Sequence, residues 1–212
     1  KSLISAGGGV HPRHAKSITL TPEVRQALGI EADKLSGDDL VKAILRAPVD
    51  LLWNGGIGTY IKATSERNAE VGDSNNDQVR INAHELNCKV IGEGGNNGMT
   101  QLARIEYARL GGRVNTDAID NSAGVDMSDH EVNIKILFQP LLSSGKLSLE
   151  ERNKILEEMT DEVNKLVLTD NYCQSMSISL AERRSKQDMP LFSTLIDYLE
   201  ERGGLKREVE FL

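Results

Sequence analysis

The chain has 212 residues, a net charge of −7 and a pI near 5.2, and its 39% hydrophobic and 27% charged residues are typical of an ordinary globular protein. The acidic balance argues against a nucleic-acid-binding surface, which needs clustered Lys and Arg. No apolar run reaches membrane-spanning length and no signal-peptide pattern opens the chain, so we expect a cytoplasmic protein with no membrane partner.

The first forty-odd positions predict two helices. The chain opens on a glycine-rich stretch without a start signal for a helix or strand, so we expect a segment of a longer protein. Thr21 and Pro22 are a good helix start, and Gly29 is a plausible stop. Ser36 opens a second helix, which ends before Pro48 because the residue preceding a proline avoids the helical conformation.

Three short apolar runs predict strands of a parallel sheet, at residues 49–53, 88–91 and 113–115. The first is nearly continuous, which predicts a strand buried on both faces. A helix capped by Thr100 lies between the second and third runs, and strand, helix and strand at this spacing indicate a βαβ unit. Residues 65–80, which lie between the first and second runs, are polar, and we expect a surface loop or a solvated helix there.

Small and amide residues follow these strands, above all in residues 92–98 and 115–125. Glycine lets the backbone approach a ligand closely, and a following helix directs free N–H groups toward it. In a parallel sheet, the carboxyl ends of the strands meet at one edge, where ligands bind. The two junctions therefore predict half of a nucleotide site. The dinucleotide fingerprint G-x-G-x-x-G is not met, since Asn97 stands at its third glycine, and tight turns with left-handed Asn are the alternative.

From Ser128 onward the pattern is helical. Ser128 and Ser148 each begin a Ser-x-x-Glu capping box, and a last helix is predicted from Pro190 to Gly203. A helix start at Ser128 is also an anion site suited to a carboxylate. We predict an α/β fold with a partial Rossmann-like parallel sheet and flanking helices, followed by a helical C-terminal region. Its domains are residues 1–127 and 128–212.

No metal site is predicted. Four aspartates lie close together in the sequence, but their spacing fits no calcium-binding loop: Asp117, Asp120, Asp126 and Asp129. The four histidines show no ligand spacing, and Cys88 and Cys173 are too few for a disulfide or zinc framework. Cys88 is expected to be a small core residue.

With these motifs assembled, the chain resembles the large bacterial NAD-dependent glutamate dehydrogenases. The resemblance rests on residues 50–60, 89–96, 115–125 and 128–135. The smaller hexameric glutamate dehydrogenases carry a Glu-Gly-Ala-Asn loop, and later Asn-Ala-Gly-Gly-Val followed by Ser and Glu. Here 93–96 and 121–125 stand in those places, with Gly95 in place of Ala and Ser-Ala at 122–123 in place of Ala-Gly.

The resemblance implies NAD as the cofactor and L-glutamate or 2-oxoglutarate as the substrate. It assigns these residues to the cofactor: Asn54, Gly94, Gly95, Asn96 and Asn121. Asn96 and Asn121 would contact the nicotinamide ribose and carboxamide, and Asn54 would line the dinucleotide cleft. Ser128 would hydrogen-bond the distal carboxylate of the substrate.

The family's catalytic lysine and aspartate lie in an upstream domain, so no catalytic residue is assigned to this chain. We expect the later part of an NAD-binding domain, inactive alone, that works with the remaining domains of the same polypeptide in a homo-oligomer. One alternative is a non-catalytic packing or oligomerisation module whose glycine loops are only turns. Another is a different amino-acid dehydrogenase, since Ser128 alone does not dictate the length of the substrate side chain.

Overall fold

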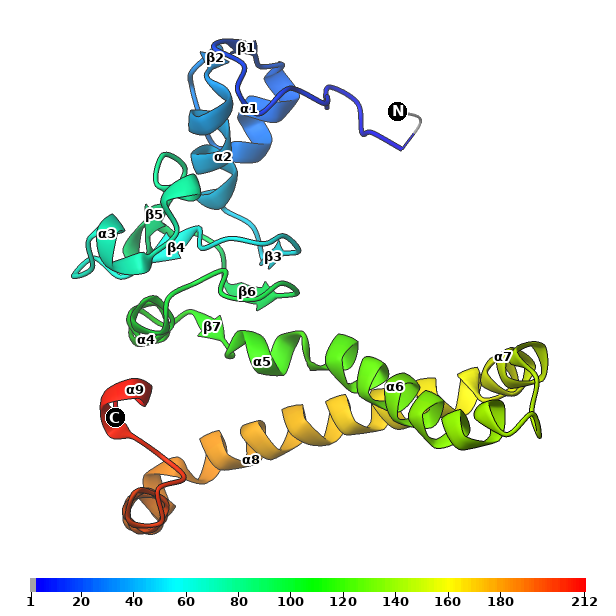
Figure 1. Cartoon of the computed structure of the whole chain (residues 1–212). Helices are drawn as coiled ribbons and strands as arrows, with labels where there is room; N and C mark the ends of the chain where they lie inside the picture. The colour runs from blue at the N-terminus through cyan, green and yellow to red at the C-terminus, as the bar shows by residue number, and fades with distance from the viewer. Residues whose placement is uncertain (1–2) are drawn as a thin grey trace. The chain divides into compact units, whose positions relative to one another are not determined.

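The computed structural model describes residues 3–212, which form two compact units. The first ends at Asp117, and the second is Ala118–Leu212; Figure 1 labels the elements of both. The α/β class with a helical C-terminal region is confirmed. The boundary between the two compact units lies earlier in the chain than the predicted domain boundary after residue 127. The roles assigned to residues 1–127 and 128–212 stay a prediction.

The first unit opens with two short strands and two helices: β1 (Ile18–Thr19), α1 (Pro22–Leu28), β2 (Lys34–Leu35) and α2 (Gly37–Leu45). Both predicted helix starts are confirmed, because each cap side chain accepts a backbone N–H that the first turn leaves unpaired. Thr21 Oγ1 accepts the N–H of Val24 at 3.3 Å, and Ser36 Oγ accepts that of Asp39 at 3.1 Å. Gly29 ends α1 with a φ of 67°, as predicted.

The predicted βαβ unit is confirmed. Its parallel sheet has the order β3–β6–β7 and is made of β3 (Leu51–Asn54), β6 (Val90–Glu93) and β7 (Arg113–Val114). The connection from β6 to β7 is α4 (Gln101–Arg109), which begins at Thr100 as predicted. Thr100 Oγ1 accepts the N–H of Ala103 at 3.1 Å.

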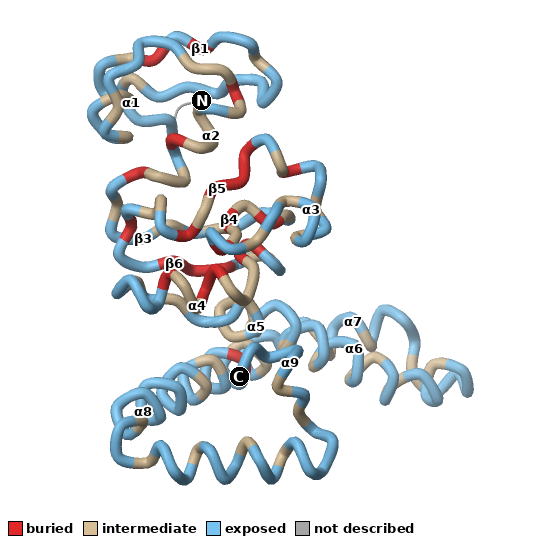
Figure 2. The backbone as a smooth tube through the Cα atoms, turned by 90° about the vertical axis from the view of Figure 1, so that its left-hand side faces the viewer, coloured by how far each residue is buried: buried red, intermediate tan, exposed pale blue. Residues whose placement is uncertain are grey.

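The prediction that β3 is buried on both faces is wrong. Leu51 and Trp53 are 54% and 57% exposed, whereas Leu52 packs against the core. Side chains alternate between the faces of a strand, and among the described residues of this unit the core covers one face of β3. Figure 2 shows the buried positions gathered around β4 (Ile61–Lys62), β5 (Ile81–Asn82), β6 and α4. The buried members of the cluster are Ile61, Ile81, Ala83, Cys88, Ile91, Met99, Ala103 and Tyr107.

Residues 65–80 are less solvated than predicted. This region holds α3 (Asn68–Val71) and the 3₁₀ turn η1 (Ser74–Asn76), between the parallel strands β4 (Ile61–Lys62) and β5 (Ile81–Asn82). Asn76, Val79 and Arg80 within or beside it are nevertheless buried. The sequence pattern failed because a polar residue is buried when its hydrogen-bonding groups find partners, as those of Arg80 do.

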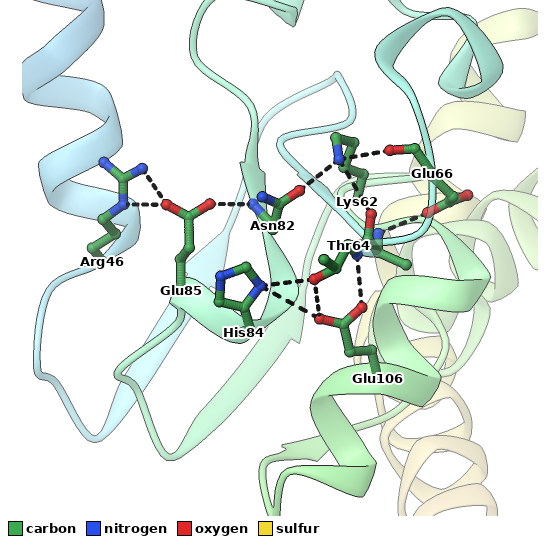
Figure 3. A network of polar contacts seen from close by, with 9 residues as sticks. Arg46, Lys62, Thr64, Glu66, Asn82, His84, Glu85 and Glu106 are labelled. Atoms are coloured by element: carbon green, nitrogen blue, oxygen red, sulfur yellow. Dashed lines mark hydrogen bonds and ion pairs between the residues drawn. The ribbon is translucent and has the colours of Figure 1, made fainter.

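A polar network fastens α2 and α4 to this core (Figure 3). Arg46 Nε donates to Glu85 in the turn η2 (Ala83–Glu85) at 3.0 Å. The Thr64 hydroxyl donates to Glu106 Oε1 on α4 at 2.7 Å and lies 2.7 Å from His84 Nδ1. Burial alone would raise the pKa of Glu106, but the backbone N–H and hydroxyl of Thr64 outweigh it and hold that pKa below its ordinary value.

The second unit is helical. After α5 (Asp117–Asp120), which spans the division between the units, its helices are α6 (Ser122–Ser143), α7 (Leu149–Glu158), α8 (Thr160–Glu201) and α9 (Arg207–Glu210). The capping box at Ser148 is confirmed: Ser148 Oγ accepts the N–H of Glu151 at 3.2 Å, and the Glu151 carboxylate accepts the N–H of Ser148 at 2.8 Å. Among the described residues of α8, Val167 is the one that is buried. No helix within residues 3–212 combines the length and apolar character that crossing a lipid bilayer requires.

Two predicted helix starts in this unit are wrong. Helix α6 begins at Ser122, with Asn121 at the N-cap, so Ser128 lies inside the helix. Helix α8 continues through Pro190 to Glu201, and Gly203 then stops it with a φ of 70°. A capping pattern can also occur inside a helix when an earlier residue takes the N-cap. A proline removes only one backbone N–H from a long helix.

Candidate functional site

The loops after β3 and β6 meet at the carboxyl edge of the sheet, as the sequence predicted. Asn54 and Glu93 end these strands and stand side by side in register. The Gly95 N–H donates to the Asn54 carbonyl at 3.1 Å, which joins one loop to the other. The Asn54 side-chain oxygen accepts the N–H of Gly56 at 3.3 Å, so the amide also holds its own loop.

Two glycines lie at this close approach. A Cβ atom on Gly95 would lie 2.4 Å from the carbonyl oxygen of Gly56. A Cβ atom on Gly98 would lie 2.0 Å from Nδ2 of Asn54 and 3.1 Å from Oε2 of Glu93. At Gly95 the atom in the way belongs to the backbone, so the two loops can touch there only with glycine. At Gly98 the atom in the way is the end of the Asn54 side chain, which would have to shift.

Trp53 lies across Gly92 of β6 and Gly94 just after it, a position that the sequence did not predict for this side chain. A Cβ atom on either Gly92 or Gly94 would come within 2.6 Å of the indole ring. One face of the ring therefore rests on the strand, while 57% of the residue stays exposed. The absence of side chains at Gly92 and Gly94 thus provides the room for a flat aromatic group at the sheet edge.

A buried ion pair lies behind the loop after β6. Glu93 is fully buried. Its two carboxylate oxygens accept hydrogen bonds from Nε and Nη2 of Arg104 on α4, at 2.7 and 3.0 Å. Nη2 of Arg104 is also 3.4 Å from the Asp117 carboxylate. Glu93 accepts the N–H of Met99 at 3.1 Å, and Asp117 accepts that of Asn97 at 2.7 Å. We call Glu93, Arg104 and Asp117 the loop clamp.

The loop clamp was missed because its members carry no local signature. The local pattern marks Glu93 only as part of the glycine loop, and it gives Arg104 no role. Asn97 has a φ of 56°, so the turn with a left-handed Asn does occur in this loop. A turn and a ligand site are compatible, because strained backbone is frequent where ligands bind.

A second set of polar groups holds the loop after β3. Asp73 accepts the N–H of Thr59 at 2.8 Å and the side-chain amide of Asn76 at 2.7 Å. Arg80 donates from Nε to the carbonyl of Thr59 at 2.8 Å. The Asn76 amide, the Thr59 N–H and, more weakly, the Arg80 charge hold the pKa of Asp73 below its ordinary value of 3.8.

This lowered pKa predicts a pH-dependent contribution to stability. The Asp73 carboxylate stabilises the folded state at pH values above 3.8, and the contribution is lost as the pH falls through the lower folded pKa. Replacement by Asn should lower the free energy of unfolding near neutral pH by about 1 kcal/mol. The difference from wild type should shrink at an acidic pH below the folded pKa, as measured by urea unfolding followed by tryptophan fluorescence.

Asp33→Asn is the matched control, because Asp33 is exposed. It should leave the stability unchanged at both pH values. A loss for Asp73→Asn that is as large at the acidic pH as at neutral pH would contradict the assignment.

The predicted cofactor and substrate residues fall in both units. Asn54, Gly94, Gly95 and Asn96 belong to the first unit, where the structure brings their two loops together. Asn121 and Ser128 belong to the second, and their contact with the same cofactor and substrate stays a prediction.

The junction after β7 is more helical than predicted. Asn121 stands between α5 and α6, and the hydroxyl of Ser122 donates to Gln174 on α8 at 2.9 Å. Ser128 is exposed inside α6, so it is not at a helix N-terminus and the predicted anion site there is wrong. The contact of its hydroxyl with a substrate carboxylate stays a prediction.

Asp126, His130 and Asp170 are the one trio of possible metal ligands in residues 3–212, with ligand atoms within 4.8 Å of one another. Asp126 and His130 are one turn apart on α6 and 3.5 Å apart as an ion pair. Helical neighbours at this spacing pair without any metal, and Asp170 is exposed. The absence of a metal site stays a prediction.

The parallel sheet and its glycine-rich edge define a Rossmann-like α/β protein. The family model described as bacterial NAD-glutamate dehydrogenase, catalytic domain, matches residues 1–181. The chain belongs to this family, which confirms the resemblance predicted from its motifs.

Three relatives are named NAD-specific glutamate dehydrogenase. The relative from Halomonas elongata is 55% identical over 210 residues, and that from Pseudomonas aeruginosa is 53% identical over 210 residues. Each of these alignments covers 99% of this chain. The relative from Mycobacterium tuberculosis is 53% identical over 218 residues and covers 100% of the chain. The chain spans 13% of the length of each relative.

Proposed function

We propose that this chain forms the nicotinamide side of the dinucleotide site in an NAD-dependent glutamate dehydrogenase. The enzyme would deaminate L-glutamate oxidatively to 2-oxoglutarate and ammonia and pass a hydride to NAD. The names of the relatives support this activity. The observation that carries the proposal is the meeting of the Asn54 and Gly95 loops at the carboxyl edge of a parallel sheet, where such folds bind their ligands.

In this proposal, residues of the chain bind the cofactor and the substrate and orient them. Asn96 and Asn121 hold the nicotinamide ribose and carboxamide, because an amide side chain offers both donors and acceptors to such groups. Asn54, Gly94 and Gly95 line the cleft and allow close approach of the backbone. The Ser128 hydroxyl donates to the distal carboxylate of the substrate. NAD supplies the hydride acceptor, and the protein places it against the substrate and excludes water.

The remaining parts of the same polypeptide supply the catalytic acid and base in this proposal. The short coverage of each relative supports such a division, since most of each relative lies outside the alignment. We further propose that the full enzyme is a cytoplasmic homo-oligomer. The 212 residues alone would show no turnover, because proton transfer needs a group within hydrogen-bond reach of the reacting atoms.

Asn121→Ala in the full-length enzyme tests the site. We expect the KM for NAD to rise about tenfold, because a donor and an acceptor for the carboxamide are lost. The KM is measured from initial rates of NADH formation at saturating glutamate. The isolated 212-residue chain, assayed beside the full-length enzyme, should form no NADH.

Asn133→Ala is the control, because Asn133 is an exposed amide on α6, the helix that follows Asn121. It should leave the KM for NAD unchanged. If Asn121→Ala alters only the size of the oligomer, the chain is a packing module and the proposed site is wrong. Steady turnover by the isolated chain would contradict the proposal that the catalytic acid and base lie in the remaining parts of the polypeptide.

A further inference from the structure

We infer that Asp117 is a positioning residue for the dinucleotide, acting through the backbone of the loop that carries Asn96. The inference rests on the proposed function. Neither the family pattern nor the glycine loops assign Asp117 a role, and its side chain accepts a hydrogen bond from the Asn97 N–H of this loop at 2.7 Å.

The loop is fixed on both sides of Asn96. On the amino side, the Gly95 N–H donates to the Asn54 carbonyl at 3.1 Å. On the carboxyl side, the Asn97 N–H donates to Asp117 at 2.7 Å. Asn96 is therefore the residue between two anchored peptide groups, and the direction of its side chain depends on both anchors.

The anchor at Asn97 opposes a conformational preference. Asn97 has a φ of 56°, and Phe211 is the one other described residue besides glycine with a positive φ. A left-handed conformation is unfavourable for residues that carry a Cβ, although Asn tolerates it better than most. Without the Asp117 carboxylate, the backbone at Asn97 would lose the hydrogen bond that holds this conformation.

Asp117 is the accessible end of the loop clamp. Its side chain is 18% exposed, whereas Glu93 at the other end is fully buried. Glu93 keeps the hydrogen bonds from Nε and Nη2 of Arg104 when Asp117 is removed. A change at Asp117 can therefore release the loop without leaving a buried charge unpaired, which separates its positioning role from the stability of the first unit.

The test compares Asp117→Ala with the conservative Asp117→Asn in the full-length enzyme. Alanine removes the acceptor for the Asn97 N–H, and the KM for NAD should rise about tenfold, since a small misplacement of a binding group is costly. The KM for glutamate should stay within about twofold of wild type. Asparagine keeps an oxygen that can accept the N–H, so it should restore most of the affinity for NAD.

Asp50→Ala is the matched control. Asp50 precedes β3 at the opposite end of the strand, and its side chain is 86% exposed and paired with Lys89 on the surface. It should change neither KM. Equal rises in both KM values for Asp117→Ala, or no recovery with Asp117→Asn, would show a merely structural role and overturn the inference.

Hydrogen exchange in the full-length enzyme, measured without NAD, gives a second readout that needs no cofactor. Protection of the Asn97 amide should fall about tenfold in Asp117→Ala and stay unchanged in Asp50→Ala, because local opening sets the exchange rate. Unchanged protection of the Asn97 amide in Asp117→Ala overturns this inference but leaves the proposed function standing. If the wild-type full-length enzyme does not reduce NAD with glutamate, the proposed function fails, and the inference with it.

Discussion

Arg104→Leu is expected to lower the free energy of unfolding of the first unit by about 3–5 kcal/mol. The variant leaves the Glu93 carboxylate fully buried without the two hydrogen bonds that Arg104 donates to it. An uncompensated buried charge costs far more than the loss of a surface contact. Urea unfolding followed by the fluorescence of Trp53 measures the change, because Trp53 is the one tryptophan of the chain and belongs to this sheet.

Two further variants test the cause of this loss. Arg109→Leu changes an exposed arginine on the same helix, and its effect should stay within about 0.5 kcal/mol. Adding Glu93→Leu to Arg104→Leu removes the carboxylate that has lost its arginine. It should recover a large part of the lost stability, because replacing a buried ion pair by apolar residues is often neutral or stabilising. Similar losses for Arg104→Leu and Arg109→Leu would contradict the argument.

Gly95→Ala is expected to lower the free energy of unfolding by about 1–3 kcal/mol. Its Cβ atom would lie 2.4 Å from the carbonyl oxygen of Gly56, and both atoms belong to backbone that a side-chain rotation cannot relieve. The two loops must therefore separate, which should also raise the KM for NAD in the full-length enzyme. Urea unfolding and initial-rate kinetics measure the two effects.

Gly56→Ala is the control for this variant. A Cβ atom on Gly56 would meet nothing within 4 Å, although it lies on the same pair of loops. It should change the stability by less than about 0.5 kcal/mol. If Gly95→Ala and Gly56→Ala lower the free energy of unfolding equally, the Gly56 carbonyl is not what excludes a side chain at position 95.

The same contact gives a physical reason for the departure from the hexameric pattern noted above. Those enzymes carry Ala in the loop where this chain has Gly95. Here the Gly95 N–H reaches the Asn54 carbonyl, and Gly56 lies directly beside it. An alanine at this position requires a wider separation of the loops than this chain has.

Helix starts could be predicted from the sequence where the signal is local. Thr21, Ser36, Thr100 and Ser148 each cap a helix, because the cap and the N–H that it accepts lie within one turn. The same reasoning failed at Ser128, where the local pattern is equally good. Helix α6 begins earlier and packs against α8, and such a tertiary contact leaves no mark near Ser128.

The candidate site, too, could be predicted only where the sequence signal is local. The glycine loops could be predicted, since glycine and amide residues after an apolar run are a short pattern. The loop clamp could not, because the pairing of Arg104 with both Glu93 and Asp117 depends on how α4 returns across the sheet. The exposed face of β3 could not be predicted either, because the hydrophobicity of a strand does not tell which of its faces the rest of the unit covers.

The register of the sheet also bears on the order in which the protein gains its structure. Leu51 of β3 pairs with Val90 of β6, so the two strands can meet only after the whole intervening segment has closed into a loop. Such distant pairings form slowly, whereas helices arise quickly from neighbouring residues. The helices therefore have the kinetic advantage, and the edge that would receive the cofactor is completed late in folding.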